Sequence, residues 1–543
     1  MSLHVRWAYL KRVAAGAIFG LYMAHLLYFL NPQVDITPMR LLTVTLVYGV
    51  ICGLLFGSAL WLLRKLRVRI FGLPALESYR AHGFGFVVLA AFIASAIYWM
   101  NLTVFRIYLP IGAVRNLSKA TTLITFVSFL LLLLWVIERT ADRRTSRTIF
   151  VIGVVLIALS SFFLYQRRES YRTERRNVVV ADVGNVAGRR NVTLVAIRNL
   201  PYDWIVTMSG EGLLPFLEGT AATSYFTRLT PFETTSWKAL WATLATGKLP
   251  SRHGVTGRFS YRTPLSGSDP EERYLLLPSG VGFRAWGLIP PVKRISAQLP
   301  AGDSLPLWTL FERVGLNATA ISWPDSTKPL PAPPNDSVMT AVTQRFSGTV
   351  KGAEIVAAFA LDRAAMQAAT ASSGLDLRVV ALEGFSETQR ALHIYTNELP
   401  SRTSAKGDAL RAYAQAIDRM LAEVSRAHPG DLLVICSPSA VVPPELPGNA
   451  YAVLARELRK DPGSDDGFAL LRGEGVVHRP NPAPGYVADI VPTILFAAGL
   501  PVGRDMDGRI LSEAFADEFL RGTTLSAIQT YEAEQVVVKR RGV

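Results

Sequence analysis

Long apolar segments near the N-terminus constrain the fold of this chain more than any other feature. Five of them approach the ~20 apolar residues that a helix needs to cross a bilayer, and no comparable stretch follows residue 165. They cover residues 13–30, 41–63, 84–102, 120–137 and 149–165. Half of the 543 residues are hydrophobic and only 18% are charged, which is too apolar for an ordinary soluble domain. The sequence therefore predicts an α-helical membrane region of five spans over residues 1–165.

The basic residues around these segments predict their orientation. The N-terminus and the second and fourth loops carry twelve Lys and Arg residues, whereas the first and third loops carry four. Because cytoplasmic loops are enriched in Lys and Arg, we expect the N-terminus in the cytoplasm and everything after the fifth span outside it. An Arg-rich linker at 166–190 runs against this rule, but long domains cross largely regardless of charge. The expectation is a multi-pass protein of a bacterial-type inner (plasma) membrane with a periplasmic C-terminal domain.

The net charge of +15 is concentrated in the membrane region, and the rest of the chain is nearly neutral. Basic residues at membrane edges favour contact with anionic lipid headgroups. No basic stripe with interleaved aromatic residues is present, so membrane lipid is an expected partner and nucleic acid is not. The two cysteines, Cys52 in a span and Cys436 in an apolar run, exclude a disulfide framework. The sequence indicates no particular protein partner.

After residue 190 the pattern changes to short apolar runs that alternate with helical stretches. The runs at 192–197, 318–322, 377–383 and 431–436 have the length of buried strands, and residues 408–428 have helical periodicity. Strands separated by helices indicate a largely parallel sheet covered on both faces. We therefore expect an α/β/α sandwich over residues 191–515, followed by a C-terminal tail at 516–543.

Three motifs in this region carry a resemblance to a known family. They are TSWKALWATLATGKLPSRHGVTG at 235–257, SWPDSTKPLP at 322–331 and ADIVPTILFAAGLPVGRDMDGRIL at 488–511. Together they resemble the type I phosphodiesterase and nucleotide pyrophosphatase branch of the alkaline phosphatase superfamily. The resemblance implies an α/β/α sandwich and, in active members, two divalent metals beside a Thr or Ser nucleophile. Five spans before such a domain also resemble the layout of lipoteichoic acid synthases and lipid A phosphoethanolamine transferases, at the level of architecture alone.

The resemblance implies metal ligands after several strands, and the residues at those positions do not fit metals. Where active members have an Asp after the first strand, this chain has Arg198. Where they have an Asp and a His four residues apart after the third strand, it has Ser386 and Arg390, and after the fourth it has Ser437. A guanidinium repels a cation and does not lose its proton in proteins. We therefore expect no metal cofactor, and the alternative is Zn or Mn held by a rearranged site.

The position of the nucleophile stays open. The resemblance places it about ten residues before Gly247, which falls on Trp237 without a gap. Ser236 and Thr235 stand beside that position and are the two candidates. Either would need an activating group to attack a phosphoryl centre.

Two hypotheses for function follow. In the first, the domain is catalytically degenerate and acts by binding an anionic headgroup or glycan, or as a partner in an envelope complex. Arg198 and Arg390, with Lys238 nearby, would then supply fixed positive charge for the ligand. Alternatively, Arg198 and Arg390 would pair with carboxylates such as Asp203 and Glu387 and fill the position of the family's metal site. In the second, the protein is an active metal-dependent phosphodiesterase or phosphoryl transferase, of phosphoethanolamine type, with a rearranged site. The sequence leaves open whether the protein is an enzyme.

Overall fold

The computed structural model divides into two compact units. One comprises Met1–Glu174 and Tyr261–Ile295, and the other comprises Arg175–Ser260 and Ser296–Val543. The structure describes residues 82–103, 111–140, 143–166, 178–183, 190–232, 237–253, 255, 259–262, 293–296, 304–326, 328–349, 351–440 and 466–540, with scattered residues before 67. Most of the first two predicted spans and of the predicted linker lies outside the described residues, as do Thr235 and Ser236.

The first unit contains three long helices where the third, fourth and fifth spans are predicted. They are α4 (His82–Thr103), α5 (Ile111–Thr140) and α6 (Arg143–Gln166). Helix α4 packs on α5 through apolar side chains and polar contacts to Thr125: Ser95 Oγ lies 2.9 Å from Thr125 Oγ1, and Trp99 Nε1 donates to the same oxygen at 2.9 Å. Within the described residues one segment, Ser118–Glu138, is long and apolar enough to cross a membrane.

The second unit is built on a seven-stranded sheet with the order β10-β3-β9-β8-β2-β7-β6. Only β9 runs against the other strands, because it pairs antiparallel with both β3 and β8. The predicted strands at 192–197, 318–322, 377–383 and 431–436 are β2, β6, β7 and β8, with β2 at the centre. The bounds are β2 (Val192–Ile197), β3 (Tyr225–Thr230), β6 (Ala318–Ile321), β7 (Leu377–Leu382), β8 (Leu432–Ser437), β9 (Gly467–Arg472) and β10 (Gly485–Tyr486).

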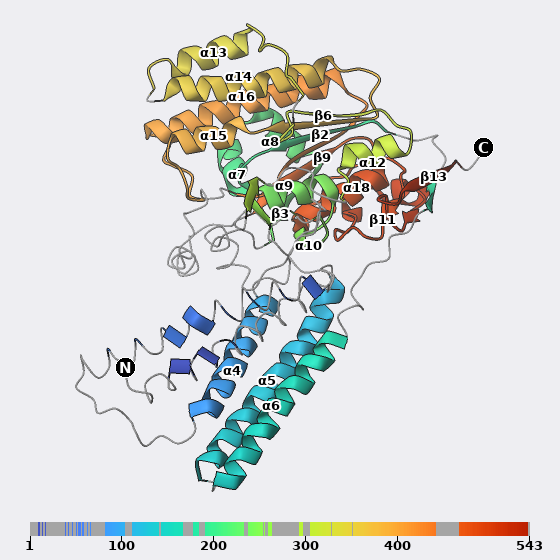
Figure 1. Cartoon of the computed structure of the whole chain (residues 1–543). Coiled ribbons are helices and arrows are strands. Elements are labelled where there is room, and N and C mark those ends of the chain that lie inside the picture. The colour runs from blue at the N-terminus through green and yellow to red at the C-terminus, as the bar shows by residue number, and fades with distance from the viewer. Residues whose placement is uncertain are drawn as a thin grey trace. The chain divides into compact units, whose positions relative to one another are not determined.

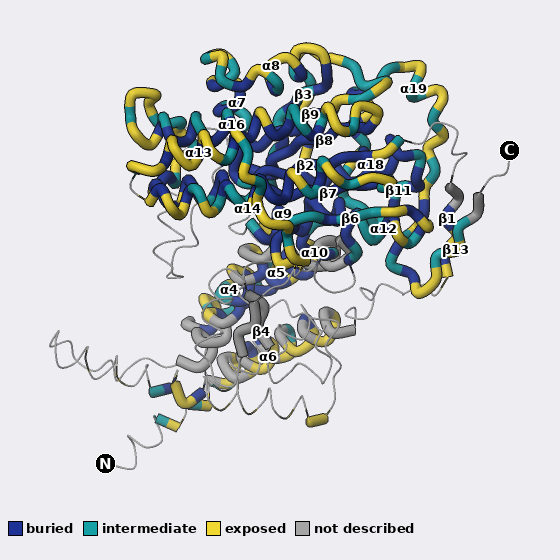
Figure 2. The backbone as a smooth tube through the Cα atoms, turned by 90° about the horizontal axis from the view of Figure 1, so that it is seen from above, coloured by how far each residue is buried: buried dark blue, intermediate teal, exposed yellow. Residues whose placement is uncertain are grey.

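Helices cover both faces of this sheet, so the predicted α/β/α sandwich is confirmed (Figure 1). Side chains of β2 alternate between the two cores: Leu194 and Ala196 join one, and Val195 and Ile197 join the other. Every residue of β2, β7 and β8 is buried (Figure 2). The core that contains Leu194 also contains residues of α9 (Trp237–Thr246), α12 (Leu307–Arg313), η5 (Val487–Asp489) and α18 (Ile490–Ala497). The core that contains Val195 also contains residues of α7 (Tyr202–Gly210), α8 (Pro215–Ala221), α13 (Ser337–Phe346), α14 (Gly352–Ala371), α15 (Gly384–Ala391) and α16 (Ala405–Ala427).

Local sequence signals explain where two of these helices begin. Asp336 caps α13 by accepting a hydrogen bond from the Met339 amide at 2.8 Å, and Ser404 caps α16 by accepting from the Gly407 amide at 3.0 Å. Such caps satisfy amides that have no partner within the helix. The described helix α16 therefore begins slightly before the predicted 408–428.

Short elements outside the central sheet tie distant parts of the chain together. Strand β1 (Val178–Val183) lies within the predicted linker and pairs in parallel with β13 (Gln535–Arg540), which lies within the predicted tail. Val179 and Ala181 of β1 are buried. Both regions thus contain strands that the sequence analysis does not anticipate. The remaining elements are α10 (Pro250–His253), β4 (Phe259–Arg262), β5 (Lys293–Ser296), β11 (Val502–Gly503), η6 (Ser512–Ala514), α19 (Asp517–Gly522) and β12 (Ala527–Ile528).

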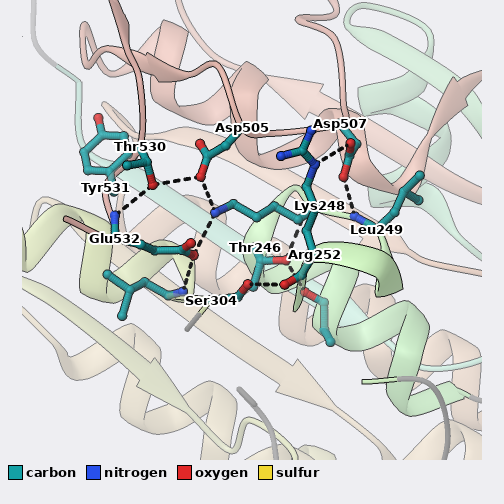
Figure 3. A network of polar contacts seen from close by, with 12 residues as sticks. Thr246, Lys248, Leu249, Arg252, Ser304, Asp505, Asp507, Thr530, Tyr531 and Glu532 are labelled. Atoms are coloured by element: carbon teal, nitrogen blue, oxygen red, sulfur yellow. Dashed lines mark hydrogen bonds and ion pairs between the residues drawn. The ribbon is translucent and has the colours of Figure 1, made fainter. Parts of the chain in front are cut away.

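A buried lysine holds the C-terminal segment against α9 and α10. Lys248 Nζ lies 2.6 Å from Asp505 Oδ2 and 2.7 Å from Glu532 Oε1 (Figure 3). Nearby, Asp507 accepts from the Leu249 amide at 2.8 Å and from Arg252 Nε at 2.9 Å. These carboxylates are committed to cations and amides of the protein, so the cluster is a structural clasp.

Candidate functional site

The candidate site lies at the carboxyl ends of β2, β7 and β8, where open α/β sheets usually bind ligands. Ile197 and Leu382 are register partners in the β2–β7 pair, so the next residues, Arg198 and Glu383, emerge side by side. Arg198 Nη1 donates to Glu383 Oε2 at 2.7 Å. The predicted cation at this strand end is therefore ion-paired with a residue from the neighbouring strand end.

Trp237, the first residue of α9, brings two of the predicted site residues together. The Arg198 guanidinium lies over its ring, 3.8 Å from the centroid, and Lys238 Nζ lies 5.7 Å from the same centroid. Lys238 Nζ is also 2.7 Å from Asp325 Oδ2. Cations over the face of an indole are attracted by its quadrupole. The cluster therefore contains two cations, two carboxylates and one aromatic ring.

The Arg198 guanidinium is buried but only partly satisfied. Its side chain is 13% exposed, whereas that of Glu383 is 32% exposed. A guanidinium offers five N–H groups, and among the described residues Arg198 makes one hydrogen bond, with its Nε buried and unpartnered. Burial lowers the pKa of Arg198 and raises that of Glu383, and in each case it outweighs the attraction between the two groups. Arginine nevertheless stays charged, so the guanidinium keeps a capacity for further acceptor atoms.

Asn199, Ser386 and Ser437, at the carboxyl ends of these strands, form hydrogen bonds with neighbouring protein groups. Asn199, in the left-handed conformation with φ of 59°, donates from Nδ2 to Ser386 Oγ at 3.0 Å. Ser437 Oγ accepts from the Leu200 amide at 3.1 Å and donates to the Ser439 carbonyl at 2.9 Å. Because Ser437 is fully buried and bonded in both roles, it serves the backbone and leaves no group for a ligand.

Arg390 is placed differently from the sequence expectation of a pocket residue. Its side chain is 71% exposed and forms an ion pair with Glu387, one turn earlier on α15. Asp203, considered as a partner for the site arginines, instead lies 2.7 Å from Arg228 Nη2. Arg390 therefore pairs with Glu387, as one of the two hypotheses predicts, whereas Arg198 pairs with Glu383 and not with Asp203.

The residues at this edge do not fit the metals that the family resemblance implies. Arg198 presents a cation, and the hydroxyl of Ser437 is already bonded twice. No group of three or more His, Cys, Asp or Glu side chains able to hold a metal ion occurs in the part of the chain that the structure describes. Hard divalent cations require several carboxylate or carbonyl oxygens, and the carboxylates here bind protein cations.

A second buried carboxylate lies behind the site. Asp362, on α14, is 2% exposed and accepts hydrogen bonds from the Gly384 amide, 3.1 Å from each oxygen, and from the Tyr413 hydroxyl at 3.0 Å. Gly384 is required here, since a β-carbon would overlap the Tyr413 hydroxyl. Burial raises the pKa of Asp362 to about 7. Asp362 therefore fixes the start of α15, which directly follows Glu383.

Sequence reasoning missed Glu383 as the partner of Arg198, and Trp237 as the surface beneath it. The missing signal was register: two parallel neighbouring strands each end one residue before a charged residue of opposite sign. The stacking on Trp237 had no such signal, because it depends on where α9 begins.

Comparisons with known proteins give only distant likenesses. No protein-family model and no curated protein matches the chain. A solved 2-O GAG sulfatase is similar at 12% identity over 62% of this chain and 75% of that one, with a TM-score of 0.38. A putative sulfatase from Bacteroides thetaiotaomicron is similar at 11% identity over 62% of this chain and 75% of that one, with a TM-score of 0.40. An inactive variant of murine ectonucleotide pyrophosphatase/phosphodiesterase 5, solved in complex with AMP, is similar at 11% identity over 60% of this chain and 100% of that one, with a TM-score of 0.36. Likenesses this distant assign no substrate and no site residue.

Proposed function

We propose that this chain is a membrane-anchored protein of the alkaline phosphatase superfamily that binds an anionic headgroup or glycan without cleaving it. The observation that carries the proposal is the state of Arg198. It stands at the end of the central strand, buried against Trp237, with one hydrogen bond among the described residues. A fixed guanidinium with unused N–H groups suits the oxygens of a phosphate or sulfate group.

The lack of fitting metal ligands supports a non-catalytic role. Two-metal phosphoryl transfer needs cations that stabilise the attacking and leaving oxygens, and the described residues offer no cluster to hold them. Ser236 and Thr235 remain nucleophile candidates from the sequence alone, because both lie outside the described residues. The hydrolase or transferase alternative rests on these two residues and on the family resemblance.

The membrane anchor belongs to the same proposal. Helices α4, α5 and α6 lie where three spans are predicted, and Ser118–Glu138 is the described segment that is long and apolar enough to cross a membrane. The periplasmic placement is proposed from the distribution of Lys and Arg residues alone. Leu525 is 61% exposed on that domain. A cysteine placed there should react with a membrane-impermeant maleimide in intact spheroplasts. Labelling only after lysis would place the domain in the cytoplasm and contradict the topology.

The experiment that tests the non-catalytic role measures metal content and turnover of the full chain in detergent. After dialysis against zinc and manganese and then metal-free buffer, we expect well under one metal equivalent by elemental mass spectrometry. We also expect no hydrolysis of bis-p-nitrophenyl phosphate or p-nitrophenyl sulfate. One or two retained equivalents, with turnover lost in Ser236→Ala or Thr235→Ala, would establish the hydrolase instead.

Binding is tested on the same preparation with matched variants. At acid pH, Arg198→Ala should lower retention of phosphatidylglycerol by the purified chain, because it removes the guanidinium that stacks on Trp237. Arg390→Ala serves as the comparison, since its exposed side chain is paired with Glu387 and its loss should change retention little. Equal retention by the wild type and Arg198→Ala would remove the basis for the proposed site.

A further inference from the structure

The charges around Trp237 are balanced, and this balance limits what the site can bind. Arg198 pairs with Glu383, Lys238 with Asp325, and the exposed Arg390 pairs with a carboxylate of its own helix. With every group ionised, three cations meet three carboxylates. An anion entering this cluster would meet no net positive charge, so one carboxylate must first be neutralised or withdrawn.

Of these three carboxylates, Glu383 is the one whose protonation or movement would free the Arg198 guanidinium. Within the described part of the chain it accepts the only hydrogen bond that the Arg198 guanidinium donates, through a single oxygen. Its side chain is more exposed than that of Arg198, so it can leave toward solvent while the guanidinium stays on the Trp237 ring. When it does, no described protein group replaces it on Arg198.

We propose that Glu383 is a built-in competitor for Arg198, and that a phosphate or sulfate oxyanion binds the guanidinium when Glu383 is protonated or displaced. This inference rests on the proposed function, because it concerns how the same anion site is regulated. No covalent step is involved: one acceptor replaces another on the Arg198 N–H groups. The site is therefore autoinhibited at neutral pH and opens in acid.

The surroundings of Glu383 favour this exchange. Burial raises its pKa, and the nearby carboxylates Glu387 and Asp325 raise it further, while Arg198 lowers it. A neighbouring Asp362 on α14 adds a carboxylate behind the strand end, and its own pKa is raised in part by Glu383. In the part of the chain that the structure describes, the other charged groups around the Arg198–Glu383 pair are Glu387, Arg390, Asp325, Lys238 and Asp362. The carboxylates of Glu387 and Asp325 repel the charged form of Glu383, so Glu383 takes up a proton more readily.

A comparable arginine elsewhere in the domain provides the control. Arg228 lies over the Tyr202 ring, 4.2 Å from its centroid, and pairs with Asp203 at 2.7 Å. It is 35% exposed and has a second carboxylate, Asp466, at 3.7 Å. The hydrogen bond that Arg228 donates to Asp203 raises the pKa of Arg228, whereas burial lowers the pKa of Arg198. The two arginines thus have the same three kinds of neighbouring group, but Arg228 is open to solvent and near two carboxylates, whereas Arg198 has a buried Nε without a partner.

The test measures inorganic sulfate binding to the full chain in phosphatidylcholine nanodiscs by isothermal titration calorimetry. Sulfate suits it because its charge does not change between about pH 5 and about pH 8. We expect the wild type to bind at least about tenfold more tightly at the lower pH, as loss of one competing charge allows. Glu383→Gln should bind equally at both pH values, at the acid affinity of the wild type, and Glu383→Ala should behave alike. Asp203→Asn should keep the wild-type pH dependence.

The outcomes separate the two levels of the proposal. Sulfate binding that depends on Arg198, but is the same in the wild type and both Glu383 variants, overturns the competitor while leaving the anion site. No sulfate binding by any variant at either pH overturns both. Discs containing phosphatidylglycerol identify the source of the natural oxyanion. Weaker sulfate binding there indicates the lipid headgroup, and unchanged binding indicates a soluble phosphate or sulfate ester.

Discussion

Replacing Asp362 with Asn should remove a pH dependence of stability that the buried carboxyl creates. Asp362 has an ordinary pKa of 3.8 when unfolded and a pKa of about 7 in the fold, chiefly because of burial. A carboxyl group with a raised folded-state pKa stabilises the fold below its unfolded pKa. That stabilisation is lost as the pH rises through the folded value. The window for this group therefore runs from about pH 4 to about pH 7.

The size of the effect follows from the two pKa values. Between about pH 5 and about pH 8, the linkage relation gives a loss of about 2.5 kcal/mol in the free energy of unfolding for a group with these values. Asn is isosteric and uncharged, and its carbonyl oxygen can still accept from the Gly384 amide. The Asp362→Asn variant should therefore lose about 2.5 kcal/mol less than the wild type over this range.

Guanidinium unfolding of the full chain in detergent, followed by tryptophan fluorescence at both pH values, measures this difference. Subtracting the variant from the wild type cancels the groups that titrate in both. Tyr413→Phe provides a second check, because the Tyr413 hydroxyl lowers the pKa of Asp362 and its removal should extend the window to higher pH. Parallel pH profiles for the wild type and Asp362→Asn would refute the reasoning.

Three further substitutions test the scaffold by chemical unfolding. Lys248→Met should destabilise the domain by about 3 kcal/mol or more, because it leaves two partly buried carboxylates without their cation; a loss near zero would mean that the clasp is dispensable. Gly384→Ala should cost about 2 kcal/mol or more, since its β-carbon would overlap the Tyr413 hydroxyl, and Gly430→Ala, where a β-carbon meets open space, is the comparison. Ser437→Ala should cost about 2 kcal/mol by leaving the Leu200 amide unpaired, and an unchanged midpoint would contradict that role.

The central strands could be predicted from the sequence because their signal is local. The run at 192–197 coincides with β2, that at 377–383 ends one residue after β7, and that at 431–436 begins and ends one residue before β8. Such strands are buried on both faces and are therefore continuously apolar. Strands β1 and β13 escaped prediction, because β1 lies in an Arg-rich stretch and its partner is more than 300 residues away.

The candidate site was predictable in its composition but only partly in its geometry. Strand ends locate Arg198 and Ser437, because a strand end is visible in the sequence as the end of an apolar run. Their partners depend on which strands are neighbours, which the sequence alone does not reveal. Arg390 shows the same limit: its spacing from Ser386 suggests one site, whereas its side chain lies at the exposed end of α15.

The pairing of β1 with β13 has a consequence for the order of events during synthesis. About 350 residues separate the two strands in the chain, so at ~5–20 residues per second a ribosome needs roughly 20 to 70 seconds between them. Throughout that time the valine-rich β1 has left the ribosome without its partner. An unpaired apolar strand is a template for wrong pairing with other chains. Nascent chains should therefore need a chaperone to protect residues 178–183 until β13 emerges.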